Sequence, residues 1–139
     1  MKPSLRPGIS RTTRIEIGRE RTIAFMGDEA RTYATPSMIL DIEHTCRELI
    51  LEHADAGEDS VGMEVAVKHL APTLMGMTVE VTARVTAAEG RKIIFEVEVK
   101  DELDKVGAGS HTRFVVEKAK TFERLKAKAA RLAALKEKT

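Results

Sequence analysis

Hydrophobic positions along the chain recur first at helical spacing and then in strict alternation, which predicts one long helix followed by strands. The helix is predicted from Pro36 to about Gly57. Thr35 precedes it with a hydroxyl that can cap free backbone N–H groups, and proline tolerates the first helical position. At about 100° per residue, one arc of this helix collects apolar side chains. The arc consists of Ile39, Ile42, Cys46, Leu49 and Ile50, while Asp41, His44, Glu48 and Glu52 lie on the opposite, polar side.

Glu43 breaks this amphipathic pattern, because it falls inside the apolar arc beside Ile39 and Ile50. A buried carboxylate without a partner is costly, and proteins that keep one usually use it. We therefore treat Glu43 as the first candidate functional residue.

The segment from Val61 to Leu70 alternates with period two and predicts a strand that Pro72 ends. His69 shares its register with Val61, Met63, Val65 and Val67, so we expect its imidazole on the core face. Together, Thr35, Glu43 and His69 supply a hydroxyl, a carboxylate and an imidazole. These are the parts of a site that activates a nucleophile or a water molecule. In the alternative interpretation, Thr35 is only a helix cap and His69 only a core residue.

Further strands are predicted before and after these elements, with turn residues between them. Their ranges are Ser10 to Ile17, Thr78 to Ala87, Arg91 to Lys100 and Lys105 to Val116. A final amphipathic helix is predicted over residues 121–139, with an apolar stripe of Phe122, Leu125, Ala129, Leu132 and Leu135. One long helix packed on an antiparallel sheet is an α+β arrangement, and 139 residues fit a single domain.

The register of the last strand is ambiguous. Val106, Ala108, Phe114 and Val116 all favour the core face, which would turn Arg113 outward. A bulge at Gly107 or Gly109 would change this.

Charge and cysteine content exclude several classes of protein. The 23 Lys and Arg residues balance 22 Asp and Glu residues, so no global field favours nucleic acid or a membrane as a partner. The segment from Lys118 to Thr139 carries a net charge of +6 and could contact phosphates, but a solvated helix face is the usual explanation. The single cysteine, Cys46, cannot form an internal disulfide and is expected to be a core residue. With no signal-peptide pattern at Met1, we expect a cytoplasmic protein.

The order and spacing of these residues resemble the fluoroacetyl-CoA thioesterase-like branch of the hotdog-fold thioesterases, over roughly Arg14 to Phe122. Thr35, Glu43 and His69 match the catalytic set of that branch. Gly62, in Val61-Gly62-Met63, resembles the glycine whose N–H faces the substrate. Arg113, in Gly109-Ser110-His111-Thr112-Arg113, resembles the active-site arginine.

The resemblance implies a hotdog fold and hydrolysis of a short acyl-CoA thioester to free acid and coenzyme A, with no metal ion and no cofactor. It also implies a homodimer or larger assembly in which Thr35 and Glu43 of one subunit lie near Gly62 or His69 of the other. The phenylalanine-rich lid of the namesake enzyme is absent from Met26 to Tyr33, where only Tyr33 is aromatic, so acyl specificity stays open.

Two other functions would use residues of the same kinds. A hydratase would use a carboxylate and a histidine, but Asp41 and His44, the only close pair, are expected on the polar side of the helix. A non-catalytic acyl-CoA-binding or regulatory module would keep Glu43 and His69 for structure alone.

Overall fold

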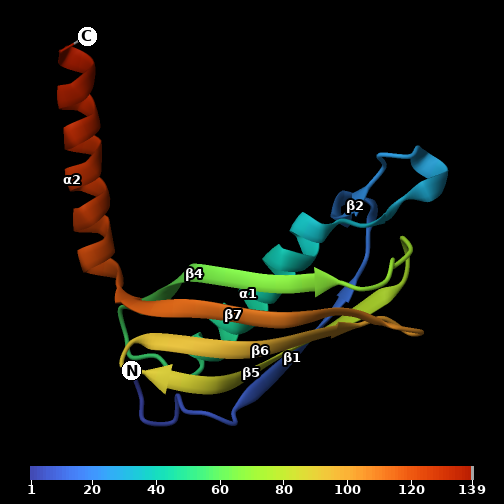
Figure 1. The fold of residues 1–139 in the computed structure, drawn as a ribbon. Helices are drawn as coiled ribbons and strands as arrows, with labels where there is room; N and C mark the ends of the chain where they lie inside the picture. The colour runs from blue at the N-terminus through green and yellow to red at the C-terminus, as the bar shows by residue number, and fades with distance from the viewer. Residues whose placement is uncertain (139) are drawn as a thin grey trace.

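A five-stranded antiparallel sheet curves along one side of a long helix in the computed structural model, which describes residues 1–138 (Figure 1). The strand order is β1-β5-β6-β7-β4, so β1 and β4 are the two edges. The strands are β1 (Ser10–Glu16), β4 (Glu58–His69), β5 (Thr78–Glu89), β6 (Lys92–Lys100) and β7 (Lys105–Glu117), and the helices are α1 (Thr35–Leu51) and α2 (Lys118–Glu137). The predicted α+β class is therefore confirmed.

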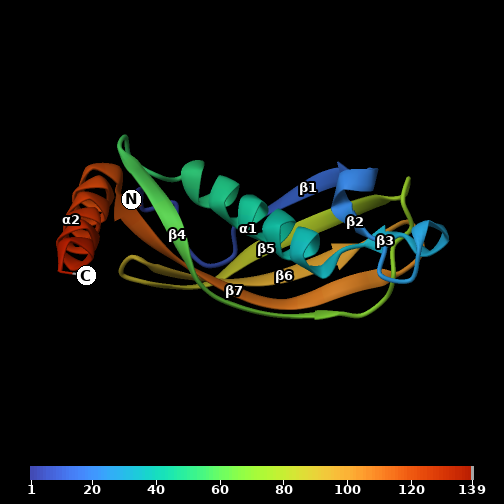
Figure 2. The ribbon, with the colours of Figure 1, turned by 90° about the horizontal axis from the view of Figure 1, so that it is seen from above.

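The core lies between α1 and the concave face of the sheet (Figure 2). Alternate residues of β5 and β6 fill it, as the period-two pattern predicted: Val79, Val81, Ala83 and Val85 from β5, and Ile93, Phe95, Val97 and Val99 from β6. Burying side chains of this size stabilises the fold by roughly 1.5–3 kcal/mol each. The two central strands and α1 thus form a rigid platform for the residues around them.

Helix α1 ends at Leu51, six residues before the predicted end at Gly57. The chain needs the intervening residues to reverse direction, since β4 already begins at Glu58. Gly57 lies in this reversal with φ +82°, a left-handed conformation that glycine adopts without strain. Gly57 therefore serves the turn into β4 and not the helix end.

Residues 18–34 form a lid segment between β1 and α1, at the opposite end of the molecule from α2 (Figure 1). It contains two short 3-10 turns and a two-stranded ribbon: Arg19–Arg21, Asp28–Ala30, β2 (Thr22–Ile23) and β3 (Thr32–Tyr33). Phe25 and Met26 at its tip are 89% and 85% exposed, whereas Tyr33 at its base is buried. The lid segment is therefore anchored at its base and open at its tip.

A β-bulge interrupts the edge strand β4 between Gly62 and Glu64. Gly62 pairs with Arg113 and Glu64 with Thr112, so Met63 is the extra residue. Because a bulge changes which face later residues point to, Val61 and Met63 do not share the inward register of His69. That part of the strand prediction was wrong, although His69 does lie on the inward face, in register with Val65 and Val67.

A second bulge, at Val106, resolves the register of β7. Val99 pairs with Gly107 and Lys100 with Lys105, so Val106 is the extra residue and is buried outside the regular alternation. Beyond it, His111, Arg113 and Val115 point inward, while Phe114 is 38% exposed. The prediction that Phe114 faces the core and Arg113 faces outward was therefore wrong. The bulge lies one residue before Gly107.

Helix α2 projects from the end of β7 away from the sheet (Figure 1). The helix was predicted from Thr121 and starts three residues earlier. Its apolar stripe contributes nothing to the core, because none of its described residues is buried. Phe122, Leu125, Leu132 and Leu135 are each more than half exposed. In the described part of the chain, no helix is long and apolar enough to span a membrane.

Candidate active site

The first half of the candidate site is a contact between the start of α1 and the end of β4. Thr35 Oγ1 lies 2.8 Å from Nδ1 of His69. The residue in the N-cap position is Ala34, and no side chain caps the helix, so the Thr35 hydroxyl does not act as the expected cap. Instead it faces the imidazole, which is the geometry of a hydroxyl activated by a base.

His69 is shielded on its other side. Its Nε2 is buried and has no hydrogen-bond partner among residues 1–138. The ring of Tyr33 packs edge-on to the imidazole, with centroids 6.2 Å apart and planes at 78°. Burial lowers the pKa of His69 below its ordinary value, because the low-dielectric surroundings disfavour the charged form. A neutral imidazole can accept a proton from Thr35.

An open cavity of about 540 Å³ reaches this pair. Thr35 and His69 line it together with apolar residues of the lid segment and of the loop after β4, including Ile23, Phe25, Leu70 and Pro72. A cavity that combines an apolar wall with a few convergent polar groups is typical of a small-molecule site.

The second half of the candidate site surrounds Glu43, two turns further along α1. Its carboxylate Oε2 lies 3.5 Å from Nη1 of Arg113, and its side chain is 40% exposed. The expectation of a buried Glu43 was wrong. Helix α1 is rotated so that Met38, Asp41 and Thr45 share the buried side, which moves Glu43 to the margin of the core.

Arg113 is buried and fully engaged. Its Nε donates to Ser60 Oγ at 2.7 Å and its Nη2 to the Ser60 carbonyl at 2.9 Å, and Nη1 lies 3.2 Å from Nε2 of His111. His111 Nδ1 in turn lies 2.8 Å from the carbonyl oxygen of Glu64. Since Nη1 can only donate, His111 accepts at Nε2 and donates from Nδ1, which defines a neutral ring. Burial is the main cause that lowers the pKa of His111.

Gly62 opens the β4 edge beside this cluster. A Cβ atom placed there would lie 3.6 Å from Oε2 of Glu43 and 3.5 Å from Nη1 of Arg113. The bulge begins at Gly62 and ends at Glu64, whose carbonyl oxygen contacts His111. Arg113 and His111 thus tie the irregular part of β4 to the carboxylate on α1.

The structure brings Thr35 to His69, and Glu43 to Gly62 and Arg113, but it does not join these two groups of residues. In the part of the chain described, no hydrogen bond or ion pair links His69 to a carboxylate. An ideal helix rises about 12 Å over the eight residues between Thr35 and Glu43. Thr35 and His69 meet within one chain, and the expected approach of Thr35 and Glu43 to Gly62 or His69 of a second subunit stays a prediction.

Sequence reasoning missed several residues around the site. Asp41 was placed on the polar face with His44, yet it is buried and bonded to Tyr33 and Arg21, while His44 is exposed. The pair expected for a hydratase therefore does not exist. His111 was also missed, although its spacing of two from Arg113 on a strand could have indicated a shared face. Cys46 was interpreted correctly: it is buried, and burial raises the pKa of its thiol to about 12.

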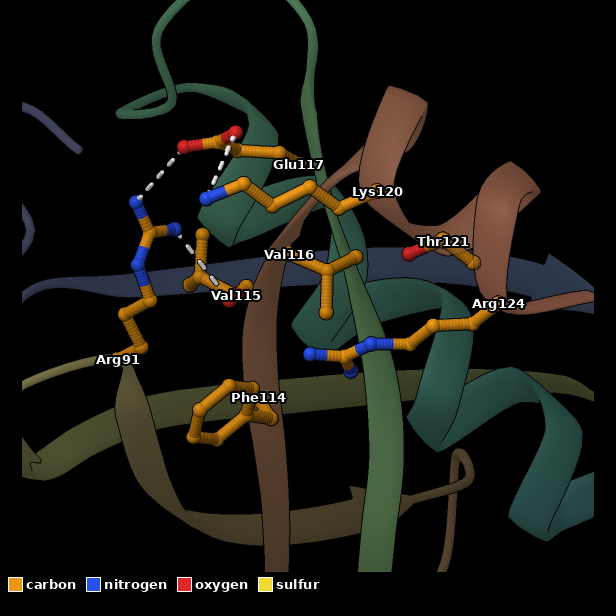
Figure 3. Close-up of a pocket in the computed structure, with 8 residues that line it drawn as sticks. All are labelled: Arg91, Phe114, Val115, Val116, Glu117, Lys120, Thr121 and Arg124. Atoms are coloured by element: carbon orange, nitrogen blue, oxygen red, sulfur yellow. Dashed lines mark hydrogen bonds and ion pairs between the residues drawn. The ribbon is translucent and has the colours of Figure 1, made fainter. Parts of the chain in front are cut away.

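A second cavity, shown in Figure 3, lies at the base of α2. Three cations line it, but Arg91 lies 3.1 Å from Glu58 and Lys120 lies 3.5 Å from Glu117, so each of these two is paired with a carboxylate. Phe114 forms its floor beside Arg124 (Figure 3). It has no imidazole and does not compete with the Thr35 cavity as a catalytic site.

A five-stranded antiparallel sheet curved around one long helix is the hotdog fold, and relatives with this fold identify the chain as a thioesterase. The match to relatives is specific. The family model for fluoroacetyl-CoA-specific thioesterases matches residues 17–119. This chain belongs to that family of acyl-CoA thioesterases, as the resemblance implied.

Individual relatives agree with this assignment. The fluoroacetyl-CoA thioesterase of Streptantibioticus cattleyicolor is 30% identical over 123 residues, which are 84% of this chain and 88% of the relative. A solved structure of the fluoroacetyl-CoA thioesterase FlK has a TM-score of 0.81 at 28% identity, covering 88% of this chain and 96% of that one. A Thermus thermophilus thioesterase superfamily member has a TM-score of 0.89 at 31% identity, covering 96% and 99%.

Proposed function

We propose that the protein hydrolyses a short acyl-CoA thioester, at a site built from Thr35 and His69 of one protomer and Glu43 of a second. The observation that carries the proposal is the 2.8 Å contact between Thr35 Oγ1 and His69 Nδ1 at the wall of an open cavity. A thioester carbonyl is already electrophilic, so a positioned oxygen nucleophile, a base and an oxyanion donor are sufficient. Glu43, the carboxylate that would complete the set, lies beside Arg113 and Gly62 of the same chain and not beside His69.

The free edge of β4 supports a second protomer as the source of that carboxylate. β4 is twelve residues long, and Val61, Met63 and Val65 on it are 44%, 57% and 37% exposed. A long apolar edge favours pairing with another strand. An antiparallel pair of β4 edges centred near Val65 and Ala66 would place Gly62 of each protomer beside His69 of the other. Glu43, which lies next to Gly62, would then approach the partner's Thr35 and His69.

The reaction breaks the thioester C–S bond and adds water across it, giving an acid and the thiol of coenzyme A. In one route the Thr35 oxygen attacks the carbonyl carbon while its proton passes to His69. The thiolate leaves with that proton, and water then releases the acyl group from Thr35 as Glu43 takes a proton from the water and returns it to the Thr35 oxygen. In the other route Thr35 and His69 hold a water molecule, Glu43 takes its proton, and the water oxygen attacks directly, after which the proton reaches the thiolate.

The preference for a small acyl group rests on the family, since a relative acts on fluoroacetyl-CoA. Selectivity for a fluorinated over an unfluorinated acyl group does not carry over from that relative. In the lid segment, Tyr33 is buried with its hydroxyl engaged by Asp41, and Phe25 is almost fully exposed, so neither side chain closes over the cavity in one protomer.

Thiol release from a panel of acyl-CoA esters of increasing chain length tests the proposal, with Thr35→Ala and His69→Gln as variants. We expect turnover of the shortest esters and a loss of about 10² or more in kcat for each variant. Thr35→Ser, which keeps the hydroxyl, is the matched control. Full activity of folded Thr35→Ala and His69→Gln would overturn the proposed site.

The same panel separates the enzyme from a binding module. A thermal shift with a nonhydrolysable acyl-CoA analogue, combined with no thiol release from any ester, would indicate binding alone. Mass spectrometry of the protein quenched during turnover then distinguishes the routes, because only attack by Thr35 adds the acyl mass to the chain.

A further inference from the structure

Asp41 is a buried carboxylate that the proposed reaction does not use. It is 1% exposed, on the side of α1 that packs into the molecule. Its Oδ2 accepts a hydrogen bond from the Tyr33 hydroxyl at 2.5 Å, and its Oδ1 accepts one from Nη1 of Arg21, also at 2.5 Å. Hydrogen bonds to a carboxylate are stronger than those between neutral groups, so Asp41 holds two residues of the lid segment to α1 as one unit.

The unit joins the lid segment to α1. Arg21 belongs to the first 3-10 turn of the lid segment, and its backbone carbonyl also accepts from the N–H of Ala34, the residue before α1. Tyr33 ends the lid segment, and its N–H donates to the carbonyl of Thr73 in the loop after β4. The lid segment, α1 and the loop after β4 therefore meet at Tyr33, through its hydroxyl on Asp41 and its backbone N–H on Thr73.

Tyr33 is also the side chain that packs edge-on to His69. The phenol cannot turn away while Asp41 holds its hydroxyl, since Tyr33 is 2% exposed. Burial and the bond to Asp41 both raise the pKa of Tyr33, so the hydroxyl remains a donor. The ring position of Tyr33 thus limits the tilt of the His69 imidazole and hence the direction of Nδ1.

Stability alone does not account for this arrangement. A buried ion pair is often no more stabilising than apolar side chains of similar volume, because both charges lose their hydration. What such a group provides is a fixed geometry, since leaving either partner unmatched is costly.

We propose that Asp41 and Arg21 are positioning residues of the active site, which act by fixing the Tyr33 ring against His69 so that Nδ1 stays directed at Thr35. They act through another residue and touch no reacting atom. This inference rests on the proposed function, because it assigns a role relative to the Thr35 and His69 pair.

The test compares Tyr33→Phe, Asp41→Leu and the double variant with Thr45→Val. Thr45 is a buried polar residue one turn further along α1, whose hydroxyl contacts Thr13 and the backbone carbonyl of Asp41. Tyr33→Phe removes one oxygen and keeps the ring, so the decision does not depend on whether Asp41→Leu folds. Each variant is measured for kcat, KM, melting temperature and the imidazole nitrogen signals of His69 by NMR.

We expect Tyr33→Phe and Asp41→Leu to lower kcat by about fivefold or more with KM nearly unchanged, as for loss of a positioning contact. The double variant should lose little more than either single one, because both disrupt the same unit. The His69 nitrogen signals should change from those of one tautomer to an average of two. Thr45→Val should lower the melting temperature without changing kcat or those signals.

Wild-type kcat and unchanged His69 signals in folded Tyr33→Phe would overturn the inference. His69→Gln in the same assay separates this from failure of the proposed function. If His69→Gln is inactive while Tyr33→Phe is normal, only the positioning role is wrong. If His69→Gln is fully active, the proposed site itself is wrong and the positioning role fails with it.

Discussion

Nη1 of Arg113 lies 3.5 Å from Oε2 of Glu43. Three acceptors, two on Ser60 and one on His111, fix the guanidinium in that position. The guanidinium is 5% exposed and the carboxylate 40%, so the arginine is the anchor and the glutamate is the group left accessible. An arginine with all its contacts inside the protein is suited to orienting Glu43 and not to direct contact with substrate.

Glu43→Gln should lower thioester hydrolysis by about 10² or more, because the amide keeps the shape of the side chain but cannot take a proton. Its melting temperature should stay close to that of the wild type, since Arg113 retains its contacts with Ser60 and His111. Glu48→Gln, on the exposed side of α1, is the control. Unchanged hydrolysis by folded Glu43→Gln would end this mechanism.

Arg113→Lys should cost stability as well as activity. A lysine ammonium cannot reproduce the fork that contacts both the hydroxyl and the carbonyl of Ser60, which leaves a buried acceptor unmatched at a cost of about 1–3 kcal/mol. Denaturant unfolding and kcat on one preparation measure both effects. Retention of full stability would contradict the scaffold role that we assign to this arginine.

His111 should make stability depend on pH. Its folded-state pKa lies below the ordinary value of 6.5, mainly through burial and also through Arg113, while the Glu64 carbonyl and Glu43 act in the opposite direction. The unfolded chain therefore binds more protons just below pH 6.5, and the contribution to stability, complete above that pH, is lost as pH falls through the folded pKa.

His111→Gln should consequently show a shallower loss of melting temperature between pH 7 and about 5 than the wild type, whatever its absolute stability. Thr45→Val, which changes a buried residue of α1 without removing a titratable group, should leave the slope unaltered. Parallel curves for His111→Gln and the wild type would contradict the prediction.

Mixing two inactive variants provides a direct test of a site shared between protomers. In a heterodimer of Thr35→Ala and Glu43→Gln chains, one site combines intact Thr35 and His69 with intact Glu43, and the other site carries both changes. After subunit exchange, activity should recover to roughly a quarter of the wild type, as statistical pairing in a two-fold dimer requires. No recovery despite exchange shown by mass spectrometry would contradict the shared site.

Removing residues 121–139 should leave hydrolysis within about twofold of the wild type, because no described side chain of α2 is buried and the active-site cavity lies at the other end of the molecule. Any loss should appear in assembly, measured by light scattering, since α2 exposes four large apolar side chains. Phe122→Ser in the full chain is the control, because it removes an apolar side chain of α2 while keeping all of its charges. A folded, correctly assembled truncation without activity would contradict this.

Much of the fold followed from the sequence because it depends on local periodicity. Strands β5 and β6 alternate without interruption, and α1 begins with a threonine and a proline. The residues that resemble the family, Thr35 and His69, also proved to be in contact. These features require no knowledge of how the elements are placed relative to one another.

The parts that were wrong depend on that placement. A helical pattern gives the angle between residues but not the rotation of the helix against the sheet, so Asp41 and Glu43 exchanged their expected environments. The partners of Asp41, which are Tyr33 and Arg21, lie 8 and 20 residues away in a segment with no regular pattern. Bulges at Met63 and Val106 carry no periodic signal, because each is a single departure from a period.

The bulge at Met63 decides which residues of β4 face α1. A strand directs successive side chains to opposite faces, so one extra residue without a bulge would move everything after it to the other face. With Met63 present, Ser60 and Gly62 before the bulge and Val65, Val67 and His69 after it all face α1, although the two sets differ in parity. Because Gly62 and Glu64 already pair with the consecutive residues Arg113 and Thr112, deleting the exposed Met63 would leave a regular strand in which His69 still faces Thr35. Deleting a residue between Glu64 and His69 would instead turn the imidazole away from Thr35, with no catalytic residue altered, unless the strand gave up its bulge.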